Sequence, residues 1–505
     1  DVYKRQALYI DQAQKLQGQG GILLDGTKTA ASAEANKASF ADGSLLIVNG
    51  SGIGTSGTAA LTGGSGSTLT VNQGAKLYLT STNAGTYTIT KGFANTTIDG
   101  WSWSADAAAV DVSVNKLSEI EKIEKNTADG DFTVTVRQTD VQKKYDGIAL
   151  PNILQAMDQS RTEYAGIKYL TDLANDNKLD KEGFIAAVNS FAQGAENSGA
   201  TRTGALAALD LGTAVQEHLS LAKAAAEQSG GFGKAAVDTA DNGGIWAQYI
   251  NNKDKVDNMG GVSYDGQYNG VIIGGDFADR GKYSSGIAFS YGSGDSTGSA
   301  SKNEFDFWGL SYYGGIQNGD TNLIFDVGYS KTSSDVKGVI KAEPDTQVIS
   351  MGIKGEKVIS NGHGTSYVPY AGLRYLNVDG GSYNGTIGGE VAAHYSTDKA
   401  DLWLLPVGIS ISHESVTAGG WKVRPTADIA YVWILGDKNT AMDITVPGVN
   451  ATDRLGYDIM DSGFFVGKLG LEAEKGEWTY GLGYACQKGS HAQNSKFMLN
   501  VTYSF

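Results

Sequence analysis

The last ten residues, KFMLNVTYSF (496–505), alternate strictly between two kinds of side chain. One set is apolar and comprises Phe497, Leu499, Val501, Tyr503 and Phe505, whereas the residues between them are mostly polar. Residues two apart share one face of a β-strand, so the segment is predicted to be a strand with one apolar face. Soluble β-sandwiches and membrane β-barrels both contain such strands. The connections between strands must therefore decide the fold.

The same period of two continues back to about residue 241 and predicts about twelve strands. Their starts are expected near residues 245, 266, 283, 303, 321, 346, 366, 401, 421, 464, 477 and 496. The connections alternate in length, from the long NNKDKVDNMGGVSYD (251–265) and the short ADRGK (278–282) to the very short KG (475–476). Outer-membrane barrels have an even strand number, short periplasmic turns and long outer loops, whereas Greek-key crossings in a sandwich would break the alternation. Residues 241–505 are therefore predicted to form an all-β transmembrane barrel.

Three further regions precede the predicted barrel. Residues 1–110 contain short β-prone runs between Gly turns, such as TLTVNQGAKLYLT (68–80), and are interpreted as the end of a β-solenoid. Residues 111–200 contain apolar residues three and four apart, beginning with LSEIEKIEK (117–125), and are predicted to be a helical linker that includes a helix opened by Pro151. Residues 201–240 are expected to comprise a long helix over 201–228 and a Gly-rich connection.

Composition excludes several classes of function. The 505-residue chain has a net charge of -15 and no Lys/Arg cluster, which argues against a nucleic-acid partner. A single cysteine and five histidines without paired ligand spacing give no candidate metal site, and no cofactor site is expected. No apolar run approaches the ~18 residues of a membrane helix. The chain begins DVYKRQALYI, without Met or a secretory signal, so we expect that a signal has been removed or that sequence is missing there.

The segment GKLGLEAEKGEWTYGLGYACQKGSHAQNSKFMLNVTYSF (467–505), with PYAGLRY (369–375), PTADIAYVW (425–433) and IWAQYINNKDKVD (245–257), resembles the autotransporter β-domain of type V secretion. The resemblance covers about residues 240–505 and is weaker for the helical region. It implies a monomeric twelve-stranded barrel in the outer membrane of a Gram-negative-type bacterium. It also implies a helix threaded through the lumen, an extracellular N-terminal passenger, and contacts with outer-membrane lipid and with the chain's own passenger.

The resemblance assigns roles to two sets of residues. A helix inside a barrel of this size must carry small side chains. The helix at 201–228 supplies them with Gly204, Ala205, Ala207, Ala208 and Gly212. Inward-facing charges that could pair around the helix, or simply be solvated, are Arg374, Arg424, Asp428, Lys468 and Glu472.

The final strand, with Val501, Tyr503 and Phe505, resembles the signal that the barrel assembly machinery reads. The resemblance therefore implies two roles for this final strand. It closes the barrel against the first strand, and it directs the chain to the outer membrane.

Translocation of a passenger is the favoured function, and other functions remain open. A passive porin with a periplasmic N-terminal domain would have no lumenal helix. A surface adhesin would keep its activity in a passenger that is missing here. A barrel enzyme would need convergent acid and His groups, and only His394 and Asp398 in one long loop suggest this. We expect no catalytic site.

Overall fold

The structure is a computed structural model that describes residues 7–15, 22–24, 36–64, 66–104, 111–220, 243–277, 283–361 and 363–505. The chain forms two compact units. The first contains Asp1–Ala192, Gly388–Ala393 and Thr445–Asp453, and the second contains Gln193–Ile387, His394–Ile444 and Arg454–Phe505. Within the described residues, no helix is both long and apolar enough to cross a membrane.

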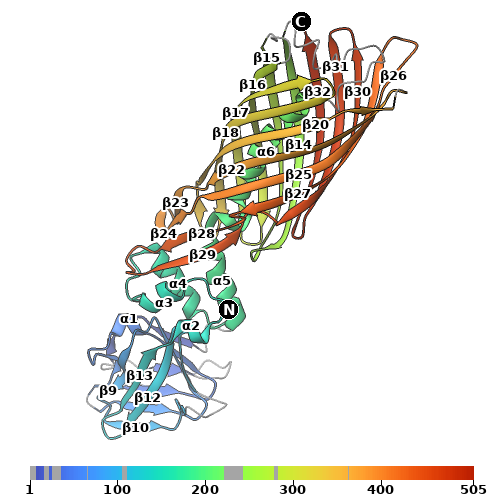
Figure 1. Cartoon of the computed structure of the whole chain (residues 1–505). Coiled ribbons are helices and arrows are strands. Elements are labelled where there is room, and N and C mark those ends of the chain that lie inside the picture. Colours follow the sequence, from blue (N-terminus) through green and yellow to red (C-terminus); the bar gives the residue numbers. More distant parts are fainter. Residues whose placement is uncertain are drawn as a thin grey trace. The chain divides into compact units, whose positions relative to one another are not determined.

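Short strands in residues 7–138 of the first unit form three sheets (Figure 1). The first has the order β1 (Ala7–Ile10), β5 (Leu45–Asn49), β8 (Lys76–Thr80), β11 (Val112–Val114). The second has the order β10 (Asn95–Ile98), β7 (Thr68–Val71), β4 (Lys37–Phe40), β3 (Ile22–Leu24). The third has the order β12 (Ser118–Asn126), β13 (Asp131–Gln138), β9 (Gly85–Lys91), β6 (Ala59–Thr62), β2 (Gln14–Lys15). The helix α1 (Gly50–Ile53) follows β5.

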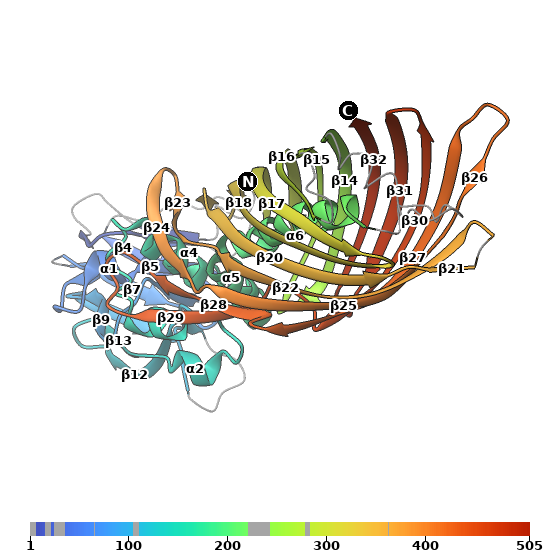
Figure 2. The same cartoon turned by 45° about the horizontal axis from the view of Figure 1, so that its top comes forward.

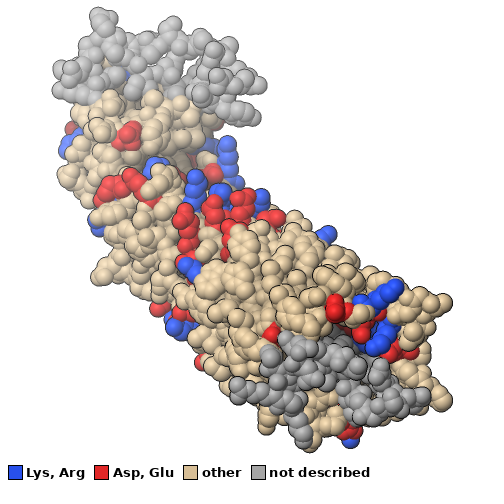
Figure 3. All heavy atoms as spheres, turned by 90° about the horizontal axis from the view of Figure 1, so that it is seen from above, with Lys and Arg blue, Asp and Glu red and all other residues tan. Residues whose placement is uncertain are grey.

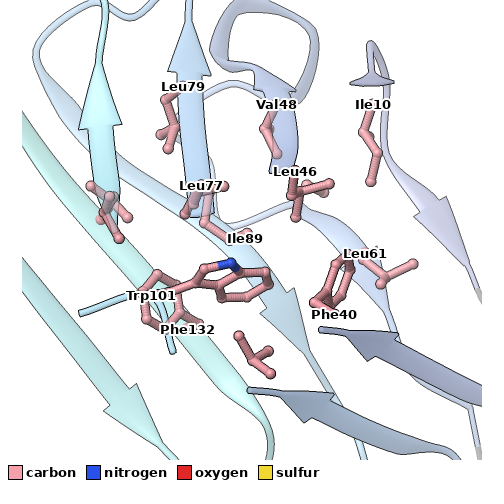
Figure 4. Close-up of a cluster of buried hydrophobic side chains, with 14 of the residues drawn as sticks. Ile10, Phe40, Leu46, Val48, Leu61, Leu77, Leu79, Ile89, Trp101 and Phe132 are labelled. Carbon is pink, nitrogen blue, oxygen red and sulfur yellow. The ribbon is translucent and has the colours of Figure 1, made fainter. Parts of the chain in front are cut away.

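From β4 to β11 the chain visits the three sheets in rotation, and each of these strands pairs in parallel with the strand one turn away, as β4 does with β7 and β5 with β8. β13 ends this arrangement, because it pairs antiparallel with β12 and β9. Figure 4 shows apolar side chains from these strands pointing toward Trp101. The Trp101 ring is fully buried between Phe40 and Phe132, with centroid separations of 5.1 and 5.2 Å. Each turn thus buries its inner face only together with its neighbours. That this region is the end of a passenger stays a prediction.

The prediction of a helix at 117–125 is wrong, because residues 118–125 lie in β12 and pair antiparallel with β13. Ile120 and Ile123 are three apart, which suits a helix face, and both pack against the buried cluster. A register shift between Ile120 and Lys122 inserts one extra residue in the strand. Such a β-bulge brings residues three apart onto one face, which explains how a helical spacing fits a strand.

Helices follow β13: α2 (Val141–Lys144), α3 (Pro151–Ala156), α4 (Ala165–Asn175), α5 (Lys181–Gln193) and the 3₁₀ helix η2 (Gly194–Ser198). Pro151 opens α3 as predicted. The first N–H groups of α3, those of Asn152 and Ile153, donate to the Asp453 carboxylate over 3.1 and 2.8 Å. Asp453 thereby caps a helix that has no cap side chain of its own.

Twelve long antiparallel strands in the described part of the second unit form a closed barrel. They are β14 (Gly244–Met259), β15 (Val262–Asp276), β16 (Tyr283–Gly298), β17 (Ser301–Asn318), β18 (Thr321–Gly338), β20 (Asp345–Lys357), β22 (Thr365–Asp379), β25 (Ala400–His413), β27 (Lys422–Gly436), β30 (Gly463–Lys475), β31 (Trp478–Lys488) and β32 (Ala492–Ser504). β14 pairs with β32 and closes the barrel, so the final strand has the structural role predicted for it.

The two ends of the barrel differ. Shorter strands extend the connections: β19 (Lys341–Ala342), β21 (Ile359–Ser360), β23 (Ser382–Ile387), β24 (Glu390–Thr397), β26 (Ser415–Val416), β28 (Asn439–Thr445) and β29 (Thr452–Asp458). We call the end with β23, β24, β28 and β29 the long-hairpin end and the other the short-turn end. Residues 251–265, predicted to be a long loop, instead continue β14 and β15 as a hairpin, because their inward and outward alternation continues. The predicted turn 278–282 lies outside the described residues.

The outward face of the barrel carries an apolar band between two aromatic girdles. Toward the long-hairpin end, exposed aromatic residues include the cross-strand pairs Tyr291–Trp308 and Tyr484–Phe497. Toward the short-turn end, they include Trp478. Figure 3 shows a broad surface with few charged side chains on the face that it draws. An apolar band flanked by aromatic girdles is the pattern of a membrane-spanning barrel.

Candidate functional site

The candidate site is the barrel lumen and the helix that it holds. The helix α6 (Ala200–His218) lies among the long strands in both Figure 1 and Figure 2. Its apolar residues Leu211 and Val215, with Leu219 directly after the helix, pack in one buried cluster with Trp246 and Ile324 of the wall. The predicted helix at 201–228 is present as far as His218, whereas Leu219 and Ser220 are not helical. The rest of the predicted helix and the connection to 240 lie outside the described residues.

The five small residues predicted for the lumen all lie on α6 and are buried. A methyl group added at Gly212 would lie 2.0 Å from Nη1 of Arg374, and one at Gly204 would lie 2.6 Å from Cγ2 of Thr346. Ala205, Ala207 and Ala208 are at most 3% exposed. The helix backbone thus approaches the wall to a distance that larger side chains would prevent.

Charged pairs fix α6 near the long-hairpin end and in the middle. Arg202 donates from Nε and Nη2 to the Asp254 carboxylate over 2.9 and 3.1 Å, with both side chains buried. Asp210 pairs with Lys496 and accepts the Tyr268 hydroxyl at 2.6 Å. These polar contacts give the helix one position along the lumen, because a shift by one turn would leave buried charges unpaired.

A second network holds the C-terminal end of α6 at the short-turn end. His218 Nε2 lies 2.9 Å from Oδ2 of Asp276, and its ring stacks on Trp246 at 4.7 Å. Tyr313 donates to the same carboxylate at 2.7 Å. Asn322 Nδ2 donates to the Leu219 carbonyl at 2.9 Å and so satisfies one of the last carbonyls of the helix.

The chain enters α6 through a buried segment, η2 and Gly199. Glu196 Oε1 accepts the Thr201 hydroxyl at 2.8 Å. Tyr264 of β15 lies against Gly199, whose φ of 70° is in the left-handed region. Tyr264 precedes Val271 of the apolar band by seven residues, or about 23 Å of strand, so this segment lies outside the membrane-spanning part. Burial raises the pKa of Glu196 to about 7, although hydrogen bonds from Thr201 lower it.

A cavity of about 220 Å³ lies beside α6, lined by Asp210 and Glu217 of the helix and by Thr426, Lys468 and Met498 of the wall. The helix therefore sits off-centre in the lumen, against β15 to β22.

Residues 245–485 match the family model of the autotransporter beta-domain. The C-terminal barrel is an autotransporter β-domain. The chain is similar to the β domain of the Bordetella autotransporter BrkA, with 18% identity over 52% of this chain and 99% of that chain and a TM-score of 0.41. It is also similar to the translocator domain of NalP from Neisseria meningitidis, with 14% identity over 61% and 99% and a TM-score of 0.45. No curated protein matches the chain.

The inward charges predicted for the β-domain all face the lumen, but most pair within the wall. Arg374 forms two hydrogen bonds with Asp326, each 2.8 Å long, and Asp326 also accepts from Gln216 of α6. Lys468 pairs with Glu217 and so contacts the helix directly.

The other three predicted charges of the β-domain contact wall residues. Arg424 pairs with Glu414 and Glu472. Asp428 accepts the hydroxyl groups of Tyr370 and Ser410. Of the five charges, Lys468 thus contacts α6 directly and Arg374 contacts it through Asp326.

The closing strand of the β-domain places its predicted residues on the outward face. Val501 is exposed, Tyr503 packs against Trp478 at 4.7 Å, and Phe505 packs against Tyr503 at 5.6 Å. The Phe505 N–H donates to the Gly243 carbonyl over 3.2 Å. These rings belong to the girdle at the short-turn end.

The residues that suggested an enzyme do not meet in the β-domain. His394 Nδ1 lies 2.6 Å from the Asn384 amide oxygen, and Asp398 pairs with Arg454. Sequence reasoning missed Arg202, Asp210 and His218 on α6. Charged residues in an otherwise Ala-rich and Gly-rich helix were the signal that could have identified them.

Proposed function

We propose that this β-domain, an outer-membrane translocator of type V secretion, carries the residues before α6 to the cell surface and holds them there with α6 as the tether. The direction of α6 carries the proposal. Arg202, near its start, lies at the long-hairpin end, and His218, its last residue, lies at the short-turn end. Because the long loops of outer-membrane barrels face the exterior, the chain before α6 leaves the lumen outside the cell.

The segments that make up the first unit support the same direction of the chain through the barrel. That unit includes the hairpin tips Gly388–Ala393 and Thr445–Asp453, which come from the long-hairpin end of the barrel. Asp453 caps α3, and Arg161 Nη1 donates to the Gly448 carbonyl at 2.8 Å. Residues 1–192 therefore pack with loops that are expected to be extracellular.

The proposed partners follow from the surfaces of the β-domain. The apolar band and its girdles fit outer-membrane lipid, and the closed sheet fits a monomer. The closing strand with Val501, Tyr503 and Phe505 is the proposed contact of the barrel assembly machinery. Passage of a porin substrate is disfavoured because α6 occupies the lumen. We propose no enzymatic activity for the barrel, and a passenger with adhesive activity is compatible with this role.

An epitope in the exposed β12–β13 turn, residues 126–129, tests the proposal. The full chain is expressed behind a secretory signal, and intact cells are stained with antibody beside a periplasmic marker. Staining of intact cells supports surface display. Staining only after the outer membrane is opened would contradict it and would favour a periplasmic N-terminal region.

A further inference from the structure

The wall behind α6 is built from small and hydroxyl-bearing residues. On neighbouring strands β16, β17, β18 and β20, the inward positions include Ser290, Gly309, Ser311, Gly328, Ser330, Thr332, Thr346 and Ser350. We call this set the hydroxyl track. The face of α6 that lies on it carries Gly204, Ala208, Leu211 and Gly212.

Several buried polar groups on or beside the hydroxyl track have no hydrogen-bond partner among the described residues. They are Oγ of Ser330, Oγ1 of Thr332, and both amide atoms of Asn303, which precedes the track on β17. These side chains are 3%, 1% and 0% exposed. The void between Ser330 and α6 is about 10 Å³, which is at the lower limit for one water. Buried polar groups are almost always paired, so this cluster requires an explanation.

The opposite wall, which lines the cavity, has a different character. Its charged groups are engaged with one another or with α6: Arg424 with Glu472, and Lys468 with Glu217. A chain passing along that wall would have to compete with these ion pairs. An ion pair, Arg374–Asp326, also borders the hydroxyl track, and Oδ1 of Asn500 on the cavity wall has no partner among the described residues. The unpartnered groups are nevertheless concentrated beside α6 on β17 and β18, where Asn303, Ser330 and Thr332 contribute four atoms.

We propose that the hydroxyl track binds the backbone of the passenger chain while that chain passes through the barrel. The inference rests on the proposed function and specifies which wall of the barrel binds the passing chain. A hydroxyl group both donates and accepts, so it can pair with the N–H or C=O of any residue. Small side chains leave room for varied passenger side chains. The last transported segment, α6, remains on this track when transport ends.

Disulfide capture of a stalled chain tests the proposal. In a Cys486→Ser background, a tightly folded domain fused before Asp1 stops export, and one cysteine is placed in the segment held in the pore. The wall carries either Ser330→Cys on the track or Thr426→Cys on the cavity wall. We expect at least fivefold more disulfide with Ser330→Cys. Equal or greater capture by Thr426→Cys would overturn the inference.

The outcome separates this inference from the proposed function. If the chain without the blocking domain never displays its N-terminal epitope and neither cysteine captures the passenger, the proposed function fails. If the epitope is displayed but capture favours the cavity wall, only the hydroxyl track fails.

Removal of the unpartnered groups gives a second readout. The variant Ser330→Ala/Thr332→Val/Asn303→Ala is expected to slow the appearance of the epitope severalfold in a pulse-chase experiment, with normal barrel insertion. The matched control Ser293→Ala/Thr297→Val removes two exposed, outward hydroxyl groups from β16. An export rate equal to that of the control would overturn the inference.

Discussion

Arg202 on α6 and Asp254 on β14 form a bidentate ion pair in which both side chains are less than 10% exposed. Arg202→Met should therefore leave a buried, unpaired carboxylate and destabilise docking of α6 by about 3–5 kcal/mol. Hydrogen exchange of the α6 amides in purified protein measures this as faster opening. The double variant Arg202→Met/Asp254→Leu should recover most of the protection.

The exposed pair Arg454–Asp398 is the control for that experiment, because both side chains are about half exposed. Arg454→Met should change α6 exchange by less than about 0.5 kcal/mol. Equal effects of the two Arg substitutions would show that the buried pair does not hold the helix.

Gly212→Ala should destabilise α6, although Ala normally favours a helix by about 1 kcal/mol over Gly. The new methyl group would lie 2.0 Å from Nη1 of Arg374, whose guanidinium is held by Asp326. Gly355→Ala is the control, since its added methyl group meets nothing within 4 Å. Protease resistance of α6 should fall only in the Gly212 variant. A gain of resistance would contradict close packing of the helix on the wall.

The stability of the buried segment formed by η2 and Gly199 should fall as pH rises. The pKa of Glu196 is about 7 in the folded protein against an ordinary value of 4.5. The protonated Glu196 carboxyl therefore stabilises the folded segment fully below pH 4.5. This stabilisation, at most about 3 kcal/mol, is lost as pH rises through 7. Hydrogen exchange near Thr201, corrected for intrinsic rates, should show more opening at pH 8 than at pH 5. Glu196→Gln should abolish this difference, and an unchanged pH profile in that variant would refute the assignment.

Asp453→Ala should loosen α3 by about 1 kcal/mol, because it removes the acceptor for two N–H groups at the helix start. Exchange at Asn152 and Ile153 should speed up about fivefold. Asp443→Ala, at an exposed residue that pairs only with Arg454 in the described structure, should leave these two amides unchanged. Unchanged exchange in the Asp453 variant would show that the hairpin tip does not cap α3.

The strands of the barrel could be predicted from the sequence because each alternates its faces, and the first and last predicted starts, 245 and 496, fall in β14 and β32. The sequence predicts a loop at 251–265, where outward residues such as Lys253 and Lys255 are polar. That polarity instead marks strands that continue beyond the apolar band.

The partners within the lumen could not be predicted in the same way. Alternation shows that Asp254 and Lys496 face inward, but the rotation of α6 decides that they meet Arg202 and Asp210. The bulge after Ile120 in β12 could not be predicted either. Apolar residues three apart are typical of a helix, and the sequence does not show that a bulge places them on one face of a strand.

The direction of the chain through the membrane is the central claim, and one cleavage experiment tests it most directly. A site-specific protease sequence is inserted in the exposed α4–α5 connection between Asn177 and Lys178, and the protease is added to intact cells. We predict that denaturing gels show two fragments, with the one containing α6 and the β-domain retained in the outer-membrane fraction. Cleavage only after the outer membrane is opened would contradict the account.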